Sequence, residues 1–310
     1  MNAAIILAKA DNTAPWRLPL GKWVDAAVDW VLDSLRAFFE VIATIFGGFY
    51  DAVDWVLSEQ AYWVIGPLIV LLALWARGWI FGAGTLVGLA IILLVNQWEN
   101  SMHTIALTLV ATVIAIVISV PVGIWMARSN TASAIIKPVL DLLQTMPAFV
   151  YLIPAVILFS VGPVAGIVAT ILFAVAPGVR LTELGIRGVD KEVVEAGNAF
   201  GASPGRILRQ IQLPLALPSI MAGVNQVIML SLSMVVIAGM VGAPGIGRPI
   251  IDSFQSINVG LGFEGGLAIV IIAVLIDRLT GTLSTGRTHH LLPQRKKKTT
   301  PATIKTSASV

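Results

Sequence analysis

Hydrophobic and polar positions form long alternating blocks along this chain. Apolar runs recur between residues 61 and 281, and polar or charged stretches separate them. A helix that crosses a bilayer needs about 20 mostly apolar residues, within a range of about 17–25. Seven segments meet or approach that length: 61–76, 79–95, 102–126, 147–162, 163–180, 219–241 and 263–281. The pattern therefore predicts an all-α membrane protein with about seven transmembrane helices, which occupy residues 61–281.

Residues 23–60 follow a different, amphipathic pattern. Charged positions recur there at steps of three and four: Asp25, Asp29, Asp33, Arg36 and Glu40. Valine, leucine and phenylalanine occupy the opposite side, tryptophans lie near the boundary, and Gly47-Gly48 interrupts the repeat. A helix of this kind lies in the plane of the membrane interface. We therefore predict that residues 1–60 form a non-spanning segment with interfacial helices in contact with lipid.

Composition supports lipid as the solvent for much of the surface. Of the residues, 57% are hydrophobic and only 12% are charged, which is low for a soluble domain. The chain has no cysteine, so disulfides and thiolate metal sites are excluded. Its three histidines lack the spacing of metal ligands. We expect no metal, no nucleic-acid partner and no catalytic nucleophile–base pair, which argues against an intramembrane enzyme.

The distribution of basic residues predicts the orientation. Most of the 20 Lys and Arg residues fall at Arg77, in the loop with Arg128 and Lys137, in the insert 180–218 and in the tail. Positively charged loops remain on the cytoplasmic side. The N-terminus is therefore predicted outside and the C-terminus inside. Residues 282–310, basic and then rich in Ser and Thr, are expected to be a disordered cytoplasmic tail.

The insert of about residues 182–218 is polar and repeatedly broken. A first amphipathic stretch runs into Gly201, and a second opens at Ser203-Pro204, a favourable helix start. We expect this second helix to stop before Pro214 and Pro218, because proline disrupts a helix interior. Two short helices joined by a glycine turn suit docking into a groove on a partner protein. On composition alone, an ordinary loop between spans remains an alternative.

Resemblance to a known family bears on this choice. Seven residues of the insert have a spacing that resembles the EAA signature of permease subunits of ATP-binding-cassette importers: Glu195, Ala196, Gly197, Gly201, Ile211, Leu213 and Pro214. The sequence departs from the signature at Gly197, where alanine is usual. Four further segments resemble the glycine betaine/proline betaine permeases of that superfamily: LLQTMPAFVYLIPAV at 142–156, FAVAPGVRLTELGIRGV at 173–189, NQVIMLSLSMVVIAGMVGAPGIG at 225–247 and GGLAIVIIAVLIDRLT at 265–280. The resemblance covers roughly residues 85–281. One departure is GAPGIG at 242–247, where the family tends to carry a GAGGLG-like run.

This resemblance implies a bundle like that of type I ABC importer permeases in the bacterial cytoplasmic (inner) membrane. The motif residues would couple it to separate ATP-binding subunits, which would hold ATP and Mg. An extracytoplasmic substrate-binding protein and a second copy of the permease in a homodimer are the other implied partners. The chain itself lacks the G-x-x-x-x-G-K-[ST] phosphate loop, and we expect neither a cofactor nor enzymatic activity on it.

The expected function is ATP-driven import of glycine betaine or a related compatible solute. Proline betaine, proline, choline and carnitine remain open as solutes. Uncharged polar residues within or beside the apolar segments are candidates for the translocation path, although hydrogen bonds between helices also explain them: Gln144, Thr145, Asn225, Gln226 and Ser233. The main alternative is an ion-coupled secondary transporter of a small zwitterion, but no clear internal repeat supports it.

Overall fold

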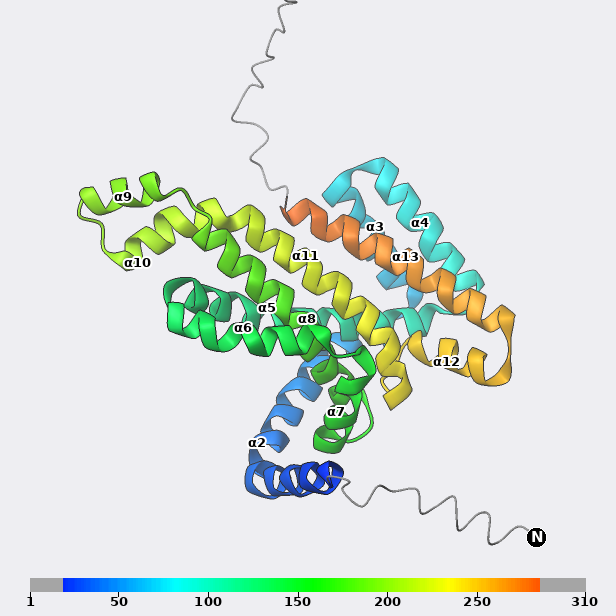
Figure 1. The fold of residues 1–310 in the computed structure, drawn as a ribbon. Helices are drawn as coiled ribbons and strands as arrows, with labels where there is room; N and C mark the ends of the chain where they lie inside the picture. The colour runs from blue at the N-terminus through cyan, green and yellow to red at the C-terminus, as the bar shows by residue number, and fades with distance from the viewer. Residues whose placement is uncertain (1–18, 285–310) are drawn as a thin grey trace, which may run out of the picture.

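The computed structural model describes residues 19–284, and that part of the chain is helical without a strand (Figure 1). The N-terminal half holds α2 (Leu20–Leu57), α3 (Tyr62–Arg77), α4 (Trp79–Leu94), α5 (Trp98–Arg128), α6 (Asn130–Thr145), η1 (Ala148–Tyr151) and α7 (Leu152–Phe159). The C-terminal half holds α8 (Pro163–Arg187), α9 (Lys191–Ala199), α10 (Pro204–Ile207), η2 (Leu208–Gln212), α11 (Leu213–Ala238), η3 (Gly239–Val241), α12 (Gly247–Ser256) and α13 (Val259–Ser284). The first 18 residues and residues 285–310 of the predicted tail lie outside the described residues, whereas residues 282–284 belong to the end of α13.

The predicted all-α membrane bundle is confirmed. Within the described range, four helices are long and apolar enough to span a membrane: 98–128, 163–187, 204–241 and 259–281. Two further pairs would bring the number to six if each were one span: α2 with α3, bent by 96°, and α6 with α7, bent by 111°. Helix α4 is apolar but shorter. Each of the seven predicted segments overlaps helical structure, whereas the number of seven spans stays a prediction.

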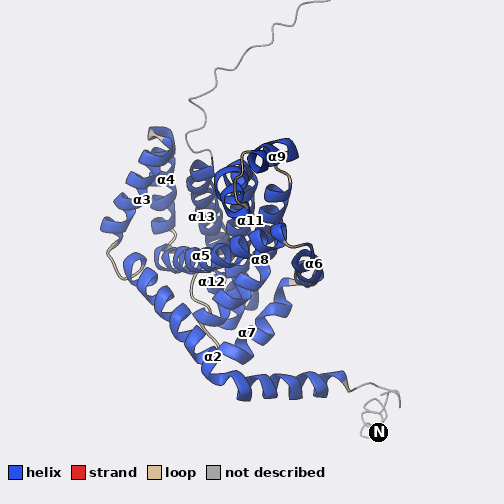
Figure 2. Ribbon diagram, turned by 90° about the vertical axis from the view of Figure 1, so that its left-hand side faces the viewer, coloured by secondary structure: helices blue, strands red, loops and turns tan. Residues whose placement is uncertain are grey.

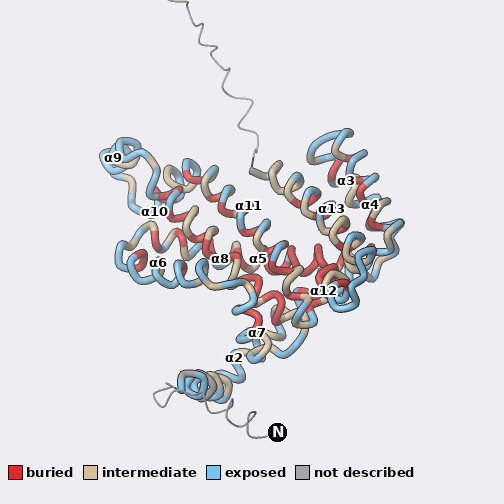
Figure 3. Tube along the Cα trace, turned by 45° about the vertical axis from the view of Figure 1, so that its right-hand side comes forward, coloured by how far each residue is buried: buried red, intermediate tan, exposed pale blue. Residues whose placement is uncertain are grey.

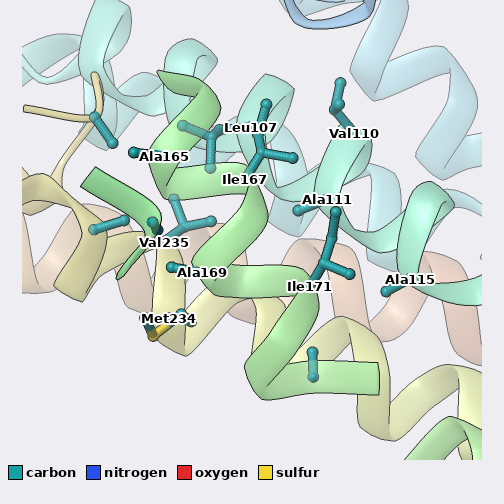
Figure 4. Packing of buried hydrophobic residues seen from close by; sticks show 14 of the residues in the cluster. Leu107, Val110, Ala111, Ala115, Ala165, Ile167, Ala169, Ile171, Met234 and Val235 are labelled. Atoms are coloured by element: carbon teal, nitrogen blue, oxygen red, sulfur yellow. The ribbon is translucent and has the colours of Figure 1, made fainter. Parts of the chain in front are cut away.

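The core of the bundle lies between α5, α8 and α11 (Figure 3). Figure 4 shows alanines and branched aliphatic side chains of these three helices packed against one another. Glycines bring the helices close together: a Cβ on Gly123 of α5 would lie 2.7 Å from the carbonyl oxygen of Val179 on α8. A Cβ on Gly178 would likewise lie 2.6 Å from Oγ of Ser119. Small residues allow this approach, which drives helix association within lipid.

The break in the amphipathic repeat at Gly47-Gly48 does not interrupt the helix. Helix α2 continues through both glycines and bends instead at Leu35, whose φ of −117° and ψ of 17° are not helical. Figure 2 shows the first part of α2 leaving the bundle at this bend. Gly47 instead serves packing, because a Cβ there would lie 3.5 Å from Cγ2 of Val164 on α8.

The expected loop around Lys137 is largely helix α6. The Oγ of Ser129 accepts a hydrogen bond of 3.1 Å from the amide of Ala132 and caps its N-terminus. Ala132, Ser133 and Leu140 are buried on one side of the helix. The expected span at 147–162 is not one straight helix. It consists of η1 and α7, which form a bent pair with α6.

The second helix of the insert does not stop before Pro214. It continues through the π-helical turn η2 into α11, which also contains Pro218. The amide of Leu213 donates to the carbonyl of Leu208, five residues earlier. A proline ring in a regular α-helix clashes with the carbonyl four residues before it. The wider π turn just ahead of Pro214 relieves that clash, so the helix continues.

Candidate functional site

The motif residues form a helical hairpin, which we call the EAA hairpin (residues 190–214). It projects at one end of α11, whereas α12 lies near the other end (Figure 1). Asp190 caps the N-terminus of α9, because its carboxylate accepts a hydrogen bond of 2.9 Å from the amide of Glu192. No residue of α9 is buried, and Phe200 at its end is 92% exposed. The outer limb of the hairpin is therefore free to contact another protein.

The turn of the hairpin depends on Gly201. Its φ is +74°, in the left-handed region that favours glycine. The amide of Gly201 donates to the carbonyl of Asn198 at 2.9 Å, and that of Ala202 donates to the carbonyl of Gly197 at 3.1 Å. These two bonds are typical of a helix that ends in a left-handed residue. The turn thereby reverses the chain between α9 and α10.

Two motif positions bring the limbs of the hairpin together. A Cβ on Gly197 would lie 2.7 Å from Cδ1 of Ile211 and 3.5 Å from Cγ1 of Ile207. The glycine therefore lets α9 approach the second limb closely. Glu195 and Ala196 are exposed on α9.

The second limb anchors the hairpin to the bundle. Leu208 is buried and Leu213 is half-buried, and both belong to an apolar cluster with Ile186 of α8. Ile124 and Ala127 near the end of α5 pack against the same cluster. Pro214, the last predicted motif residue, is exposed. The first three motif residues thus lie on the exposed limb, Gly201 forms the turn, and the last three lie on the limb that is anchored in the bundle.

A charge cluster around one buried glutamate at the base of the hairpin was not among the predicted site residues. Glu183 of α8 has a side chain that is only 5% exposed, and its Oε1 accepts a hydrogen bond of 2.7 Å from Ser133 of α6. The same oxygen lies 2.9 Å from Nε of Arg187 and 3.3 Å from Nζ of Lys137. A glutamate and an arginine four residues apart would have indicated an ion pair on α8. The partners from α6 could not be inferred in this way.

An open cleft of about 480 Å³ separates α9 from the ends of α5 and α8. Arg128, Arg187 and Lys191 line it together with Glu195 and apolar side chains. Because the cleft lies between α9 and the bundle, the hairpin contacts the bundle mainly through its second limb and through the short connection from α8 to α9. Among the described residues, no group of three or more histidine or acidic side chains could hold a metal ion.

The structure does not gather the predicted translocation residues into one site. Gln144 and Thr145 are exposed at the end of α6, whereas the other three lie on α11. The hydroxyl of Ser233 donates to the carbonyl of its own helix at Met229. Asn225 is half-buried, and its Oδ1 accepts a bond of 3.4 Å from Thr280 of α13.

Asn225 also lines an open cleft of about 410 Å³, together with Arg77 of α3 and Asp277 of α13. Gln226 is exposed on the same helix. Asn225 is thus the candidate for which a cleft can be named.

Comparison with known proteins identifies the family. The sequence profile described as binding-protein-dependent transport system inner membrane component matches residues 119–286. The glycine betaine/carnitine transport permease protein GbuB of Listeria monocytogenes is 47% identical over 85% of this chain and 94% of its own length. The glycine betaine/proline betaine transport system permease protein ProW of Escherichia coli is 44% identical over 85% of this chain and 74% of its own length.

Solved structures agree in fold. A chain of the MetNI methionine ABC transporter in an inward-facing conformation superposes with a TM-score of 0.55 at 21% identity. The alignment covers 61% of this chain and 94% of the other. At this identity the similarity shows the fold alone.

The helical bundle and its projecting hairpin thus define a multi-pass permease subunit of the ATP-binding-cassette importer class. The chain belongs to the family of binding-protein-dependent transport system inner membrane components.

Proposed function

We propose that this chain forms the membrane pathway for glycine betaine or a closely related compatible solute, and that the EAA hairpin couples it to ATP hydrolysis on a partner. The observation that carries the proposal is the hairpin itself, with one limb exposed and the other anchored in the bundle. The names of the relatives GbuB and ProW support a betaine as the solute.

The partners follow from this role. ATP-binding subunits, which would hold ATP and Mg, grip the exposed limb with Glu195 and Ala196. Gly197 and Gly201 shape this limb, and Ile211, Leu213 and Pro214 fix the other limb to the core. A second copy of the chain forms a homodimer around the pathway, because one chain presents one hairpin and a motor of two ATPase subunits needs two. An extracytoplasmic binding protein delivers the solute.

The hairpin lies on the cytoplasmic side in this proposal, with the N-terminus outside and the C-terminus inside. Arg128, Lys191, Arg206 and Arg209 at or near the hairpin support that orientation. Residues 1–60 lie outside in this proposal, and the exposed Trp23 and Trp30 of α2 suit contact with lipid headgroups at the membrane interface. The tail 282–310 lies in the cytoplasm.

For the pathway, Asn225 is the strongest of the predicted residues because it lines a cleft between three helices. Gln144, Thr145, Gln226 and Ser233 remain proposed contributors to other stretches of the path. A net-neutral zwitterion needs no fixed charge along its route, so uncharged polar side chains suit it.

The test is reconstitution of the chain with its ATPase and binding protein in vesicles, where solute uptake and ATP hydrolysis are measured together. We expect glycine betaine, delivered by the binding protein, to stimulate hydrolysis. Gly201→Asp and Glu195→Lys should abolish uptake while the protein still inserts. Uptake that survives both changes, or that an ion gradient drives without ATP, would contradict the proposal.

The orientation has its own test, because the chain has no native cysteine. Asn198→Cys places a single exposed thiol on α9. An impermeant maleimide should label it in inside-out vesicles and leave it unlabelled in intact cells. Labelling from the outside would overturn the coupling role of the hairpin.

A further inference from the structure

The last residue of α8, Arg187, makes contacts with three helices at the base of the EAA hairpin. Its Nε lies 2.9 Å from Oε1 of Glu183 on α8, and its Nη1 donates to Oδ1 of Asn130 on α6 at 2.9 Å. Its Nη2 donates to the carbonyl of Met126 on α5 at 2.8 Å. Each guanidinium nitrogen thus binds a different helix. The planar fork of arginine makes this possible, whereas a lysine ammonium could not reproduce it.

Each of these contacts is favourable for a physical reason. Met126 lies in the last turn of α5, where carbonyls have no partner within the helix and the helix dipole attracts cations. The buried carboxylate of Glu183 would be costly if it were unpaired, and Arg187 and Lys137 neutralise it. Ser133 donates the hydrogen bond that holds the carboxylate in place. The cluster therefore fixes the ends of α5, α6 and α8 to one another.

The position of this cluster connects it to the hairpin. Only Gly188, Val189 and Asp190 separate Arg187 from the start of α9. Helix α9 buries no residue, so a force on it reaches the bundle through these three residues and through the anchored second limb. The second limb meets α5 through the apolar cluster that contains Leu208, and Val189 packs against the same cluster. Both connections thus end on α5 and α8.

We propose that Arg187, held in place by Glu183, is the positioning residue that makes α5, α6 and α8 move as one body when the EAA hairpin is displaced. This inference rests on the proposed coupling function. Without the guanidinium fork, the apolar contact of the second limb with α5 would remain, but movement of the hairpin would bend the end of α8 away from α5 and leave α6 behind. Hydrolysis would then continue while solute movement failed.

Arg187→Lys is the test, because it keeps the charge beside Glu183 and removes the fork. The chain offers a matched control: Arg36 and Glu40 on α2 form another pair four residues apart, 2.9 Å from nitrogen to oxygen, but their side chains are 82% and 65% exposed. In vesicles with the ATPase and binding protein, we expect Arg187→Lys to insert normally and to hydrolyse ATP. Solute transported per ATP should fall about tenfold or more, since charge-assisted hydrogen bonds are lost. Arg36→Lys should match the wild type.

The outcomes separate the two proposals. If wild-type vesicles show no ATP-driven uptake, the proposed function fails. If the wild type and Arg187→Lys transport the same amount of solute per ATP, the proposed function stands and the role of Arg187 is overturned. A purely structural role would lower the amount of inserted protein and leave transport per ATP unchanged, which would also overturn it.

A second measurement avoids any failure of the variant to fold. Spin labels on Ala134→Cys of α6 and Leu184→Cys of α8, both exposed positions, report the separation of these helices in an otherwise native chain. A single label at Asn198→Cys reports the separation of the hairpins in a pair of copies. On trapping with ATP, the hairpin distance should shift and the α6–α8 distance should not. A shift of both distances would overturn the inference.

Discussion

Gly197 and Ile211 face each other across the EAA hairpin, at a distance that leaves no room for a larger residue at position 197 without movement. A methyl group on Gly197 would lie 2.7 Å from Cδ1 of Ile211. The contacting atom is the end of a flexible side chain, so a small group can be accommodated if Ile211 changes rotamer. This contact links the exposed limb of the hairpin to the limb anchored in the bundle.

Gly197→Ala should therefore be tolerated. The rotamer change of Ile211 is offset by the better helix propensity of alanine, worth about 1 kcal/mol in a helix interior. We expect uptake and the thermal midpoint to stay close to those of the wild type. Gly197→Leu should instead push α9 away from the second limb and reduce uptake, with insertion retained. Equal uptake by the leucine variant would show that the contact is not needed.

Gly201→Ala should weaken the hairpin because of backbone strain and not because of crowding. No atom lies within 4 Å of a Cβ built there, but the φ of +74° costs a residue with a Cβ about 1–2 kcal/mol. Hydrogen exchange of the α9 amides measures this loss. Gly205→Ala is the matched control, since its site is equally open and its φ lies outside the left-handed region. Protection of α9 that falls equally in both variants would exclude strain as the cause.

Gly123→Ala should destabilise the bundle core. Its Cβ would lie 2.7 Å from the backbone oxygen of Val179, which cannot move aside as a side chain can. Overpacking of this kind typically costs about 1–3 kcal/mol. The thermal midpoint in detergent should fall, whereas Gly84→Ala on α4, where no atom lies within 4 Å, should leave it unchanged. An unchanged midpoint for Gly123→Ala would contradict the close packing of α5 on α8.

Asp54→Ala should release the end of α2 from α5. The Oδ1 of Asp54 lies 2.7 Å from Nδ1 of His103 on α5 and also accepts from the hydroxyl of Ser58. The Asp54 and His103 side chains are 18% and 21% exposed, so loss of the carboxylate should cost about 1–3 kcal/mol. Limited proteolysis should then cleave α2 faster. Asp51→Ala, at an exposed position on the same helix, is the control, and equal cleavage of both variants would argue against a specific attachment.

The sequence by itself determined that the long apolar segments are helical and where along the chain the hairpin lies, although it did not predict helix α6. Lipid offers the backbone no hydrogen bonds, so a spanning segment must be helical. Its side chains must also be mostly apolar, and this requirement appears in the sequence as a long apolar run. The turn at Gly201 was also predictable, since a glycine between two amphipathic stretches is a typical helix end. The spacing of the EAA signature then identified residues on both limbs of the EAA hairpin.

The tertiary structure alone decided which side of each helix packs inward and which charges meet. Lipid and the protein interior are both apolar, so hydropathy does not distinguish the fully buried Ala73 from Trp75, which is 85% exposed. The bend of α2 at Leu35 was likewise not indicated by the amphipathic repeat. Ser133 and Glu183 lie 50 positions apart, and only the packing of α6 on α8 brings them to 2.7 Å. The periodicity of a segment shows which of its sides is apolar, whereas a polar contact between two helices depends on how the helices are placed relative to each other.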